Sequence, residues 1–309
     1  MPCCKAEKLK WCKSLDTTIA NDGKEYCVFH APEGQKQITI EEFNELVLKK
    51  IEEAKDSGQK CDLSGTFFEG PINLSQYDEK NPLPFMNFQE VTFNADADFR
   101  NVTFNKEVSF NKAIFKESAS FWHTSFRGWA SFCEANFLKK AFWTGTKFDQ
   151  KSTFLLATFA EGAYFSETTF NDSVNFRMAK FHRGAVVGGT FQREVDFRQV
   201  LFDGDTEFRG TFNKRVSFWW STFKADADFR DIVFHDVTDF SRCSIEKALL
   251  LVELDLSYCS FLDCSIRNCH FIRCKWPRIR GRRASYDEKN KAPYEKVEEL
   301  YRQLKWKYK

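Results

Sequence analysis

The sequence lacks the features that would place it in a membrane or outside the cell. No apolar run in its 309 residues approaches the roughly 18 residues that a membrane-spanning helix needs. The first residues, MPCCKAEKLKWCKSLD, have no apolar central stretch and therefore differ from a secretory signal. Eleven cysteines without an export signal favour a reducing compartment, in which thiols are free or bound to metal. We therefore expect a soluble, cytoplasmic protein.

An excess of charge and a catalytic motif are also missing. Lys and Arg number 46 against 44 Asp and Glu, which favours neither nucleic acid nor a membrane surface as a partner. The five histidines are scattered, and the 14 glycines form no phosphate-binding loop. Asp-Phe-Arg triplets, at 98–100 and 228–230, are expected to form charged ladders on the surface rather than acid–base pairs. The sequence therefore predicts a protein that is not an enzyme.

Phenylalanine, by contrast, is abundant, with 35 copies against 3 methionines, and it recurs at a fixed spacing. From residue 88 to 181 a large apolar residue returns after alternately five and six residues, at 88, 93, 99, 104, 110 and onward. A helix has a period near 3.6 and a strand a period of 2, so neither accounts for this spacing. Two places before each large residue stands a small or β-branched one, such as Ala97 or Val102. A repeat of 11 residues indicates a solenoid, with coils of about 22 residues.

Every fourth large residue falls into one of four columns, which predict a coil with four sides. The columns begin at Phe88, Phe93, Phe99 and Phe104, and all their positions up to residue 276 are apolar. Two steps between the third and fourth columns shorten to four residues, 187–191 and 208–212, and both place a glycine (Gly189, Gly210) in the small slot. We expect a backbone there that only glycine tolerates. Toward the end of the rod several small slots are cysteines, for which core packing is favoured over metal binding: Cys243, Cys259, Cys264, Cys269 and Cys274.

A large central residue with a small one two places earlier resembles the motif of the pentapeptide-repeat family, and the resemblance covers residues 61–276. It implies an all-β solenoid, a right-handed quadrilateral β-helix with phenylalanines stacked along its axis and about nine or more coils. The eleven-residue period departs from the family pattern and implies two longer, opposite sides. An earlier partial coil is predicted at Leu63, Phe68 and Leu74, and residues 75–87 are predicted to interrupt it as a loop.

Helical caps are predicted at both ends, because an open coil exposes unpaired backbone groups. In the first cap, residues 39–60, Thr39 and Glu42 match a capping box. Its predicted buried stripe consists of Phe43, Leu46, Val47 and Ile51. Residues 277–309 are predicted to form a basic linker and an amphipathic helix, with Pro293 near the start of the helix. The basic composition of this segment allows its helix to contact a membrane.

The N-terminal segment, residues 1–38, contains a candidate metal site. Its ligands would come from Cys3, Cys4, Cys12, Cys27 and His30. Zinc prefers thiolate and imidazole ligands at close range, and a segment with so little core would gain stability from a bound metal. The alternative is a set of free cysteines near a flexible terminus. The spacing does not show which of the adjacent Cys3 and Cys4 would be the ligand. If these residues bind a cofactor, we expect zinc; the sequence alone leaves both alternatives open.

The column register also predicts an interaction surface. The residues next to each column position point outward, and on the third side they include Trp122, Phe142, Tyr164 and Val186. An apolar stripe of this kind commonly marks a protein contact, with Trp and Tyr as favoured anchors. The contact can be a homodimer, since one side of a rod can pair with itself across a two-fold axis. Two alternatives stay open: the termini or residues 75–87 cover the stripe, or the aromatic ladder only stabilises the sheet.

Together these features predict a non-enzymatic protein-interaction or scaffold module built on a rigid β-helical rod. One alternative is a soluble regulatory domain of a larger membrane-associated protein, because some similar pentapeptide-repeat chains continue into membrane segments. A second, less favoured alternative is the DNA mimicry by which some family members bind topoisomerases. Mimicry requires an acidic rod, whereas residues 88–276 hold 24 basic and 24 acidic residues.

Overall fold

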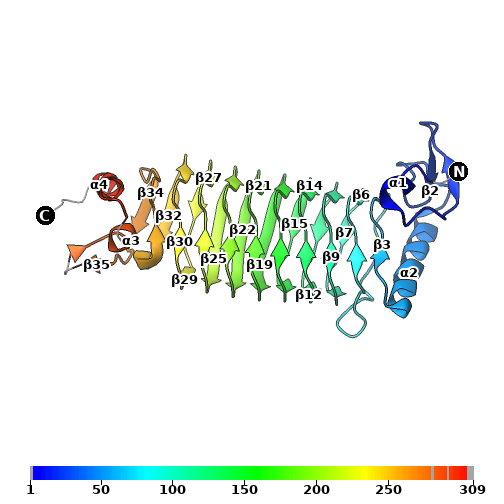
Figure 1. The fold of residues 1–309 in the computed structure, drawn as a ribbon, viewed down its shortest axis with the longest axis horizontal. Coiled ribbons are helices and arrows are strands. Elements are labelled where there is room, and N and C mark those ends of the chain that lie inside the picture. The colour runs from blue at the N-terminus through cyan, green and yellow to red at the C-terminus, as the bar shows by residue number, and fades with distance from the viewer. Residues whose placement is uncertain (1–2, 280–281, 291, 305–309) are drawn as a thin grey trace.

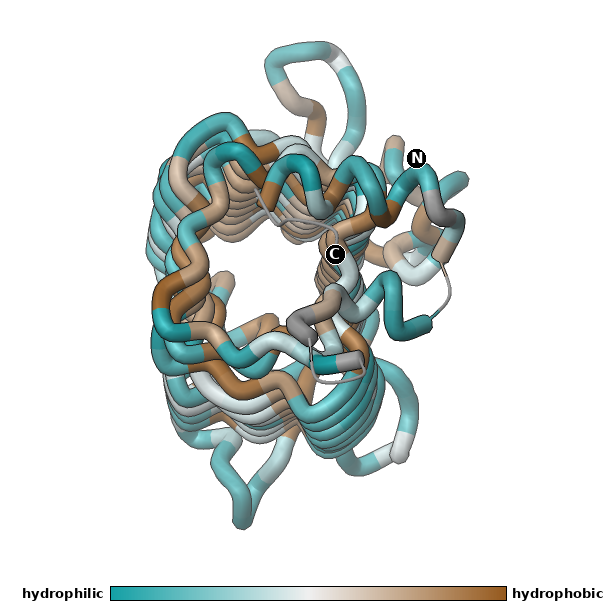
Figure 2. Tube along the Cα trace, turned by 90° about the vertical axis from the view of Figure 1, so that its left-hand side faces the viewer, coloured by the Kyte–Doolittle hydropathy of each residue, from teal (hydrophilic) through white to brown (hydrophobic). Residues whose placement is uncertain are grey.

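The chain forms a rod of parallel β-strands with helices at each end (Figure 1). The computed structural model describes residues 3–279, 282–290 and 292–304. Strands of successive coils pair in register, most often 22 residues apart, as Phe115 does with Phe137. Seen along the axis, the coils lie behind one another as a four-sided tube (Figure 2). The predicted all-β solenoid with a period of about 22 residues is therefore confirmed.

Three sheets make up the four sides of the rod. The first side is a sheet of ten strands: β3 (Cys61–Asp62), β5 (Met86–Asn87), β9 (Val108–Ser109), β13 (Ala130–Ser131), β17 (Ser152–Thr153), β20 (Val174–Asn175), β23 (Val195–Asp196), β26 (Val216–Ser217), β30 (Thr238–Asp239) and β33 (Cys259–Ser260). The second side is a sheet of nine strands: β4 (Phe67–Phe68), β6 (Thr92–Phe93), β10 (Ile114–Phe115), β14 (Asn136–Phe137), β18 (Thr158–Phe159), β21 (Lys180–Phe181), β24 (Leu201–Phe202), β27 (Thr222–Phe223) and β31 (Ser244–Ile245).

The third sheet covers both remaining sides. Its strands on the third side are β7 (Ala97–Asp98), β11 (Ala119–Ser120), β15 (Lys140–Phe142), β19 (Gly162–Phe170), β22 (Ala185–Phe191), β25 (Thr206–Phe212), β28 (Ala227–Asp228), β32 (Leu249–Val252) and β34 (Cys269–Ile272). Those on the fourth side are β8 (Thr103–Phe104), β12 (Ser125–Phe126), β16 (Lys147–Phe148) and β29 (Ile232–Phe234), together with the second halves of β19, β22 and β25.

The remaining elements lie at the two ends. The N-terminal end has α1 (Ala6–Leu9), an antiparallel pair of β1 (Thr17–Ile19) with β2 (Glu25–Cys27), and α2 (Ile40–Ser57). The C-terminal end has a short 3-10 helix η1 (Leu256–Tyr258), an antiparallel pair of β35 (Arg278–Ile279) with β36 (Arg282–Arg283), α3 (Tyr286–Lys289) and α4 (Tyr294–Gln303).

The columns of large residues fill the interior of the rod. In the first column the rings of Phe110, Phe132 and Phe154 stack with nearly parallel planes, within 4°, and centroids 5.0 and 4.9 Å apart. Rings of neighbouring columns meet edge to face, as Phe121 and Phe132 do at 5.5 Å and 85°. Both arrangements are favourable for aromatic pairs. The spacing of phenylalanine therefore reflects a core in which each ring contacts the coil before it and the coil after it.

Two opposite corners of each coil depend on backbone in the left-handed region. Positive φ occurs two places after each position of the first column, at Glu90, Lys112, Glu134, Leu156, Met178, Gln199, Trp220, Arg242 and Asp263. The same offset from the third column gives Asn101, His123, Gly145, Glu167, Gly189, Gly210, Asp231, Glu253 and Arg273. A left-handed residue costs a non-glycine side chain about 1–2 kcal/mol. This turn is compatible with almost any side chain but costs stability in every coil.

The two shortened corners need glycine, as the sequence predicted. Gly189 has φ +128° and Gly210 has φ +89°, and the two residues pair across adjacent coils. A Cβ on Gly189 would lie 2.0 Å from the carbonyl oxygen of Thr168, and one on Gly210 would lie 2.1 Å from that of Gly189. Strands β22 and β25 run through this corner as continuous strands of seven residues.

The first coil is complete, which corrects the prediction of a loop over residues 75–87. Leu63, Phe68 and Leu74 occupy three columns, as predicted, and Leu83 pairs with Phe104 to fill the fourth. Leu83 follows Leu74 by nine residues instead of five, so the spacing does not reveal it. The insertion therefore ends before Leu83, and Met86–Asn87 already forms a strand of the next coil.

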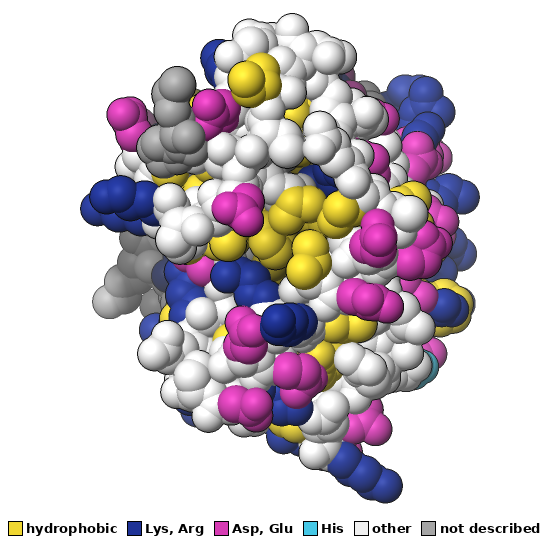
Figure 3. Space-filling view, turned by 90° about the vertical axis from the view of Figure 1, so that its right-hand side faces the viewer, with side chains coloured by type: hydrophobic (Ala, Val, Ile, Leu, Met, Phe, Trp, Pro, Cys, Tyr) yellow, Lys and Arg dark blue, Asp and Glu magenta, His cyan; other side chains and the backbone are white. Residues whose placement is uncertain are grey.

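Helix α2 crosses the N-terminal end of the rod (Figure 1). Its capping box is confirmed: the Thr39 hydroxyl accepts the Glu42 N–H at 3.2 Å, and the Glu42 carboxylate accepts the Thr39 N–H at 2.8 Å. Phe43 packs edge-on against Phe68 of the first coil, with centroids 5.5 Å apart. Leu46 was predicted to be buried but is 40% exposed, so that prediction is wrong. Figure 3 views this end and shows hydrophobic side chains near its centre with charged side chains around them.

The C-terminal end is covered by α3 and α4. Pro293 precedes the first residue of α4, as predicted, and the helix buries Val297, Leu300 and Tyr301. The buried carboxylate of Asp287 accepts hydrogen bonds from the Ser260 hydroxyl at 2.6 Å and from the backbone N–H of the next residue at 3.0 Å. Over the described part of the chain, every helix is too short or too polar to cross a lipid bilayer.

Candidate functional sites

The aromatic stripe, which we define as Trp122, Phe142, Tyr164 and Val186, lies on the third side of the rod. Phe142 pairs in register with Tyr164, and Tyr164 pairs with Val186. The Phe142 and Tyr164 rings stack with centroids 5.1 Å apart, and Trp122 meets Phe142 edge to face at 6.2 Å. The structure thus brings all four residues together across successive coils. In the coils beyond this set the paired positions are polar: Ser120 pairs with Phe142 on one side, and Glu207 pairs with Val186 on the other.

The stripe is only partly accessible. Trp122 is 44% exposed, whereas Phe142, Tyr164 and Val186 are half-buried, in part because the rings cover one another. A small depression beside Trp122 is lined by Ser75, at the start of the insertion in the first coil, and by Asp98 and His123. The insertion therefore reaches the edge of the stripe but leaves Trp122 exposed. Stacking on the sheet and exposure to solvent coexist here, so the ladder and the interface alternatives both keep support.

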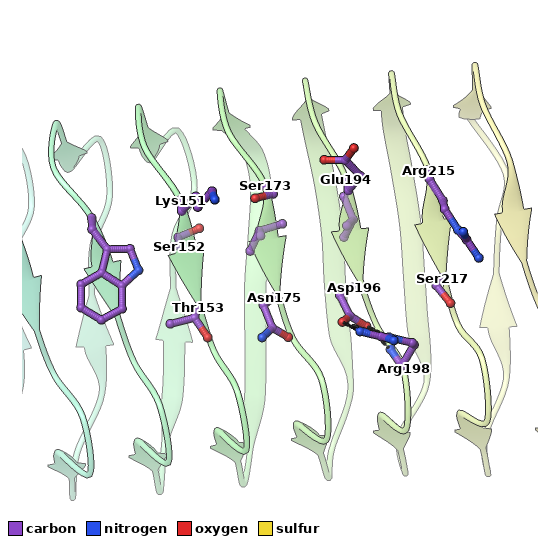
Figure 4. A pocket seen from close by; sticks show the side chains of 13 residues that line it. Lys151, Ser152, Thr153, Ser173, Asn175, Glu194, Asp196, Arg198, Arg215 and Ser217 are labelled. Atoms are coloured by element: carbon purple, nitrogen blue, oxygen red, sulfur yellow. Dashed lines mark hydrogen bonds and ion pairs between the residues drawn. The ribbon is translucent and has the colours of Figure 1, made fainter.

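A polar groove on the first side was not predicted from the sequence. It has a volume of about 500 Å³ and is lined by residues of strands β17, β20, β23 and β26 (Figure 4). Trp129, just before β13, and Arg215, just before β26, also belong to its lining. Between them Lys151, Thr153, Asn175, Asp196 and Arg198 line it. The signal in the sequence is the set of small polar residues just before first-column positions, Thr153, Asn175 and Ser217.

The Asp-Phe-Arg triplets form pairs within one coil rather than ladders between coils. Arg100 donates to both oxygens of the Asp98 carboxylate at 2.6–3.0 Å, and Arg198 does the same to Asp196 in the groove. The predicted ladder between coils is therefore wrong in its geometry, although the charges do lie on the surface. Because the Asp98 carboxylate is hydrogen-bonded to Arg100, its pKa is lowered, which makes it a poor proton donor.

Four of the five predicted metal ligands come together at the N-terminal end. The ligand atoms of Cys3, Cys12, Cys27 and His30 all lie within 4.8 Å of one another, and all four residues are buried. Cys4 is exposed and lies outside this group. Cys3 precedes α1, Cys12 follows it, Cys27 ends β2, and His30 lies in the turn after β2, where its N–H donates to the Cys27 carbonyl at 3.0 Å.

Burial disfavours the charged forms of Cys12, Cys27 and His30. It raises the pKa of the Cys12 thiol to about 12 and that of Cys27 to about 11, and it lowers the pKa of His30. The Nδ1 atom of His30 lies 3.1 Å from Cys27 Sγ and 3.5 Å from Cys3 Sγ. The site thus holds three thiols and one imidazole, a combination that suits zinc.

The cysteines of the last coils are packed in the core, where the sequence favoured them. Cys243, Cys259 and Cys264 are buried, and Cys269 and Cys274 are half-buried. The Cys274 thiol donates to the carbonyl of Leu251 in the preceding coil at 3.0 Å, as the hydroxyls of Thr124 and Thr146 do to carbonyls elsewhere in the rod. Among the described residues, only the N-terminal group brings three or more Cys, His, Asp or Glu ligand atoms together in this way.

Comparison with known proteins supports the repeat. A family model described as pentapeptide repeats (9 copies) matches residues 88–136 and 165–211. No curated protein matches the chain. The matched residues lie in the coils described above, and the unmatched residues between them continue the same four columns without a break. The resemblance predicted from the sequence is therefore confirmed: in these two stretches the chain carries repeats of the pentapeptide-repeat family.

Proposed function

We propose that this protein is a non-enzymatic interaction module, in which a rigid β-helical rod presents the aromatic stripe to a protein partner. The observation that carries the proposal is the contiguous set of Trp122, Phe142 and Tyr164 on a rod whose outward residues are mostly polar. Aromatic residues of this kind dominate the binding energy of protein interfaces. Because the strands beneath them are held in register by parallel pairing, the backbone of the stripe is already ordered before a partner binds.

The membrane-associated alternative draws on the C-terminal helix. The apolar side chains Val297, Leu300 and Tyr301 of α4 are buried, so a membrane could contact them only after the helix leaves the last coil. Residues 305–309 of the predicted amphipathic segment lie outside the described residues. Membrane contact through this helix stays a prediction, and the stripe is the feature that favours the interaction module over it.

The experiment replaces two stacked residues of the stripe with acids, Phe142→Glu with Tyr164→Glu. Its matched control places the same charges on the second side of the same coils, Asn136→Glu with Thr158→Glu, a pair that is also in register. We expect the stripe variant alone to lose self-association in light scattering, or a partner that the wild type retains in a pull-down. A folded stripe variant with unchanged mass and unchanged partners would refute the proposal. If it unfolds while the control stays folded, the ladder interpretation is supported instead.

A further inference from the structure

The residues around the N-terminal cysteines form a site prepared for a metal ion. In a tetrahedral zinc site, bonds of about 2.3 Å to sulfur and 2.0 Å to nitrogen place the ligand atoms about 3.5–3.8 Å apart. The distances of 3.1 and 3.5 Å from His30 Nδ1 to two thiol sulfurs are close to this arrangement, and no pair in the group exceeds 4.8 Å. The group therefore needs only small shifts to close around a single ion.

A hydrogen bond from outside the group sets the tautomer of His30. Its Nε2 lies 3.0 Å from the backbone carbonyl oxygen of Ser64, which can only accept. Nε2 must therefore carry the proton, and Nδ1 presents its lone pair to Cys3 and Cys27. A histidine that binds a metal characteristically donates its second ring nitrogen to a carbonyl or carboxylate in this way. The indole N–H of Trp11 also points to Ser64, at 3.3 Å from the carbonyl and 3.1 Å from the hydroxyl oxygen.

The same hydrogen bonds connect the site to the rod. Ser64 follows β3 in the first coil, so His30 contacts the edge that the rod would otherwise leave open. The backbone N–H of Phe67 in β4 donates to the carbonyl of Phe29, between Cys27 and His30, at 2.9 Å. The Cys27–His30 turn thus provides backbone pairing for the first coil.

We infer that Cys3, Cys12, Cys27 and His30 bind one zinc ion, which fastens the N-terminal segment onto the first coil of the β-helix. This inference is independent of the proposed partner surface, which lies on the side of the rod. The segment has a two-stranded hairpin and one turn of helix, so it has little core to fold around. A structural zinc ion supplies folding free energy in small segments of this kind. Three thiolates favour zinc over calcium or magnesium, which take oxygen ligands.

The test begins with the metal content of the full chain, expressed with added zinc and purified without chelators. We expect about one zinc per chain in the wild type and in Cys4→Ser, and loss of the metal in Cys3→Ser and Cys27→Ser. Cys4→Ser is the matched control, because it removes an adjacent thiol that lies outside the group. Cobalt added to the metal-free protein should give the intense visible absorption of a tetrahedral site with thiolate ligands.

Hydrogen exchange then tests the fastening on the wild-type chain. Removal of zinc with a chelator should expose the amides of the first coil, such as Gly65 and Phe67, while amides of the middle coils keep their protection. This measurement does not depend on a variant that folds poorly. A wild type without zinc, iron in its place, equal loss of metal in Cys4→Ser, or an unchanged first coil after zinc removal would each overturn the inference.

Discussion

Replacement of Phe132 by alanine tests the assignment of the columns to the interior. Phe132 is completely buried in the middle of the first column, between the stacked rings of Phe110 and Phe154. Its edges also meet Phe121 at 5.5 Å and Trp143 at 6.2 Å. The substitution removes a ring from a stack that continues on both sides, so it creates a cavity within the rod rather than at its surface.

The expected loss follows from how little the site can collapse. Truncation of a buried phenylalanine to alanine costs about 3–5 kcal/mol, and the cost is greater where the surroundings cannot close the cavity. Here backbone hydrogen bonds fix the spacing between the coils, so the coils cannot move together to close the cavity. These bonds run from the Phe132 N–H to the Thr153 carbonyl at 2.8 Å and from the Phe110 N–H to the Ser131 carbonyl at 2.7 Å. We therefore expect a loss in the upper half of that range.

The control is Cys133→Ala, one residue along the chain and on the outer face. The Cys133 thiol is half-buried and has only weak sulfur contacts, 3.5 Å to the Ser131 hydroxyl and 3.6 Å to the Thr153 hydroxyl. Its removal should change the free energy of unfolding by no more than about 0.5 kcal/mol.

Urea unfolding followed by circular dichroism gives the stability of both variants. Because a solenoid can unfold in segments, the fluorescence of Trp143 should be followed as well, although the other tryptophans contribute to the signal. Equal losses at the two positions, or a loss below about 1 kcal/mol for Phe132→Ala, would refute the assignment of inward and outward residues.

Two further substitutions test the corner and the C-terminal cap. Gly189→Ala should lower the unfolding midpoint strongly, because its Cβ would clash with the Thr168 carbonyl. Gly188→Ala should change the midpoint little, because its Cβ would make only ordinary contacts, from 3.4 Å. Equal effects of the two substitutions would contradict the corner geometry. Asp287→Ala should lower the free energy of unfolding by about 1–3 kcal/mol, because it leaves the Ser260 hydroxyl and the Phe261 N–H buried without their acceptor. Hydrogen exchange should increase at the Phe261 amide but not in the middle coils. Unchanged exchange at Phe261 would show that α3 does not hold the last coil.

The columns could be predicted from the sequence because one physical requirement fixes them. A large residue must fill the interior behind each side of every coil, so Phe110 and Phe132 recur at the spacing of the backbone and are visible without a structure. Leu83 was missed because an insertion separates it from Leu74, although it fills the same position of its coil as Phe104 does in the next. Periodicity thus identifies a coil only while the chain connecting its sides keeps a constant length.

The details of the sites depended on contacts between distant residues. Cys3 and Cys4 are adjacent in sequence, but only the Cys3 side chain joins the group of possible ligands. The backbone N–H of Cys4 donates to the Glu25 carbonyl at 2.7 Å, which joins this turn to β2. Leu46 lies on the predicted apolar stripe of α2, but the surface that buries Phe43 does not extend to it. The spacing of residues along the chain therefore predicts neither the hydrogen bonds that the N-terminal segment makes nor how much of a helix face is buried.

The caps restrict where a partner can bind. An uncovered end of a parallel solenoid offers unpaired N–H and C=O groups to which another strand can add. At the N-terminal end Phe67 N–H is already paired with Phe29, and rings of Trp11, Phe29, Phe43 and Phe68 form a continuous series of edge-to-face contacts that joins the second column. At the other end the Asp287 carboxylate and the Gln303 side chain accept hydrogen bonds from backbone N–H groups of the last coil, those of Phe261 and Ile266.

Growth of the rod by strand addition is therefore opposed at both ends, and the sides remain as the surfaces for recognition. Of these, the third side combines a contiguous set of partly exposed aromatic rings with a fixed backbone, which is why the double substitution at Phe142 and Tyr164 is the decisive test of function.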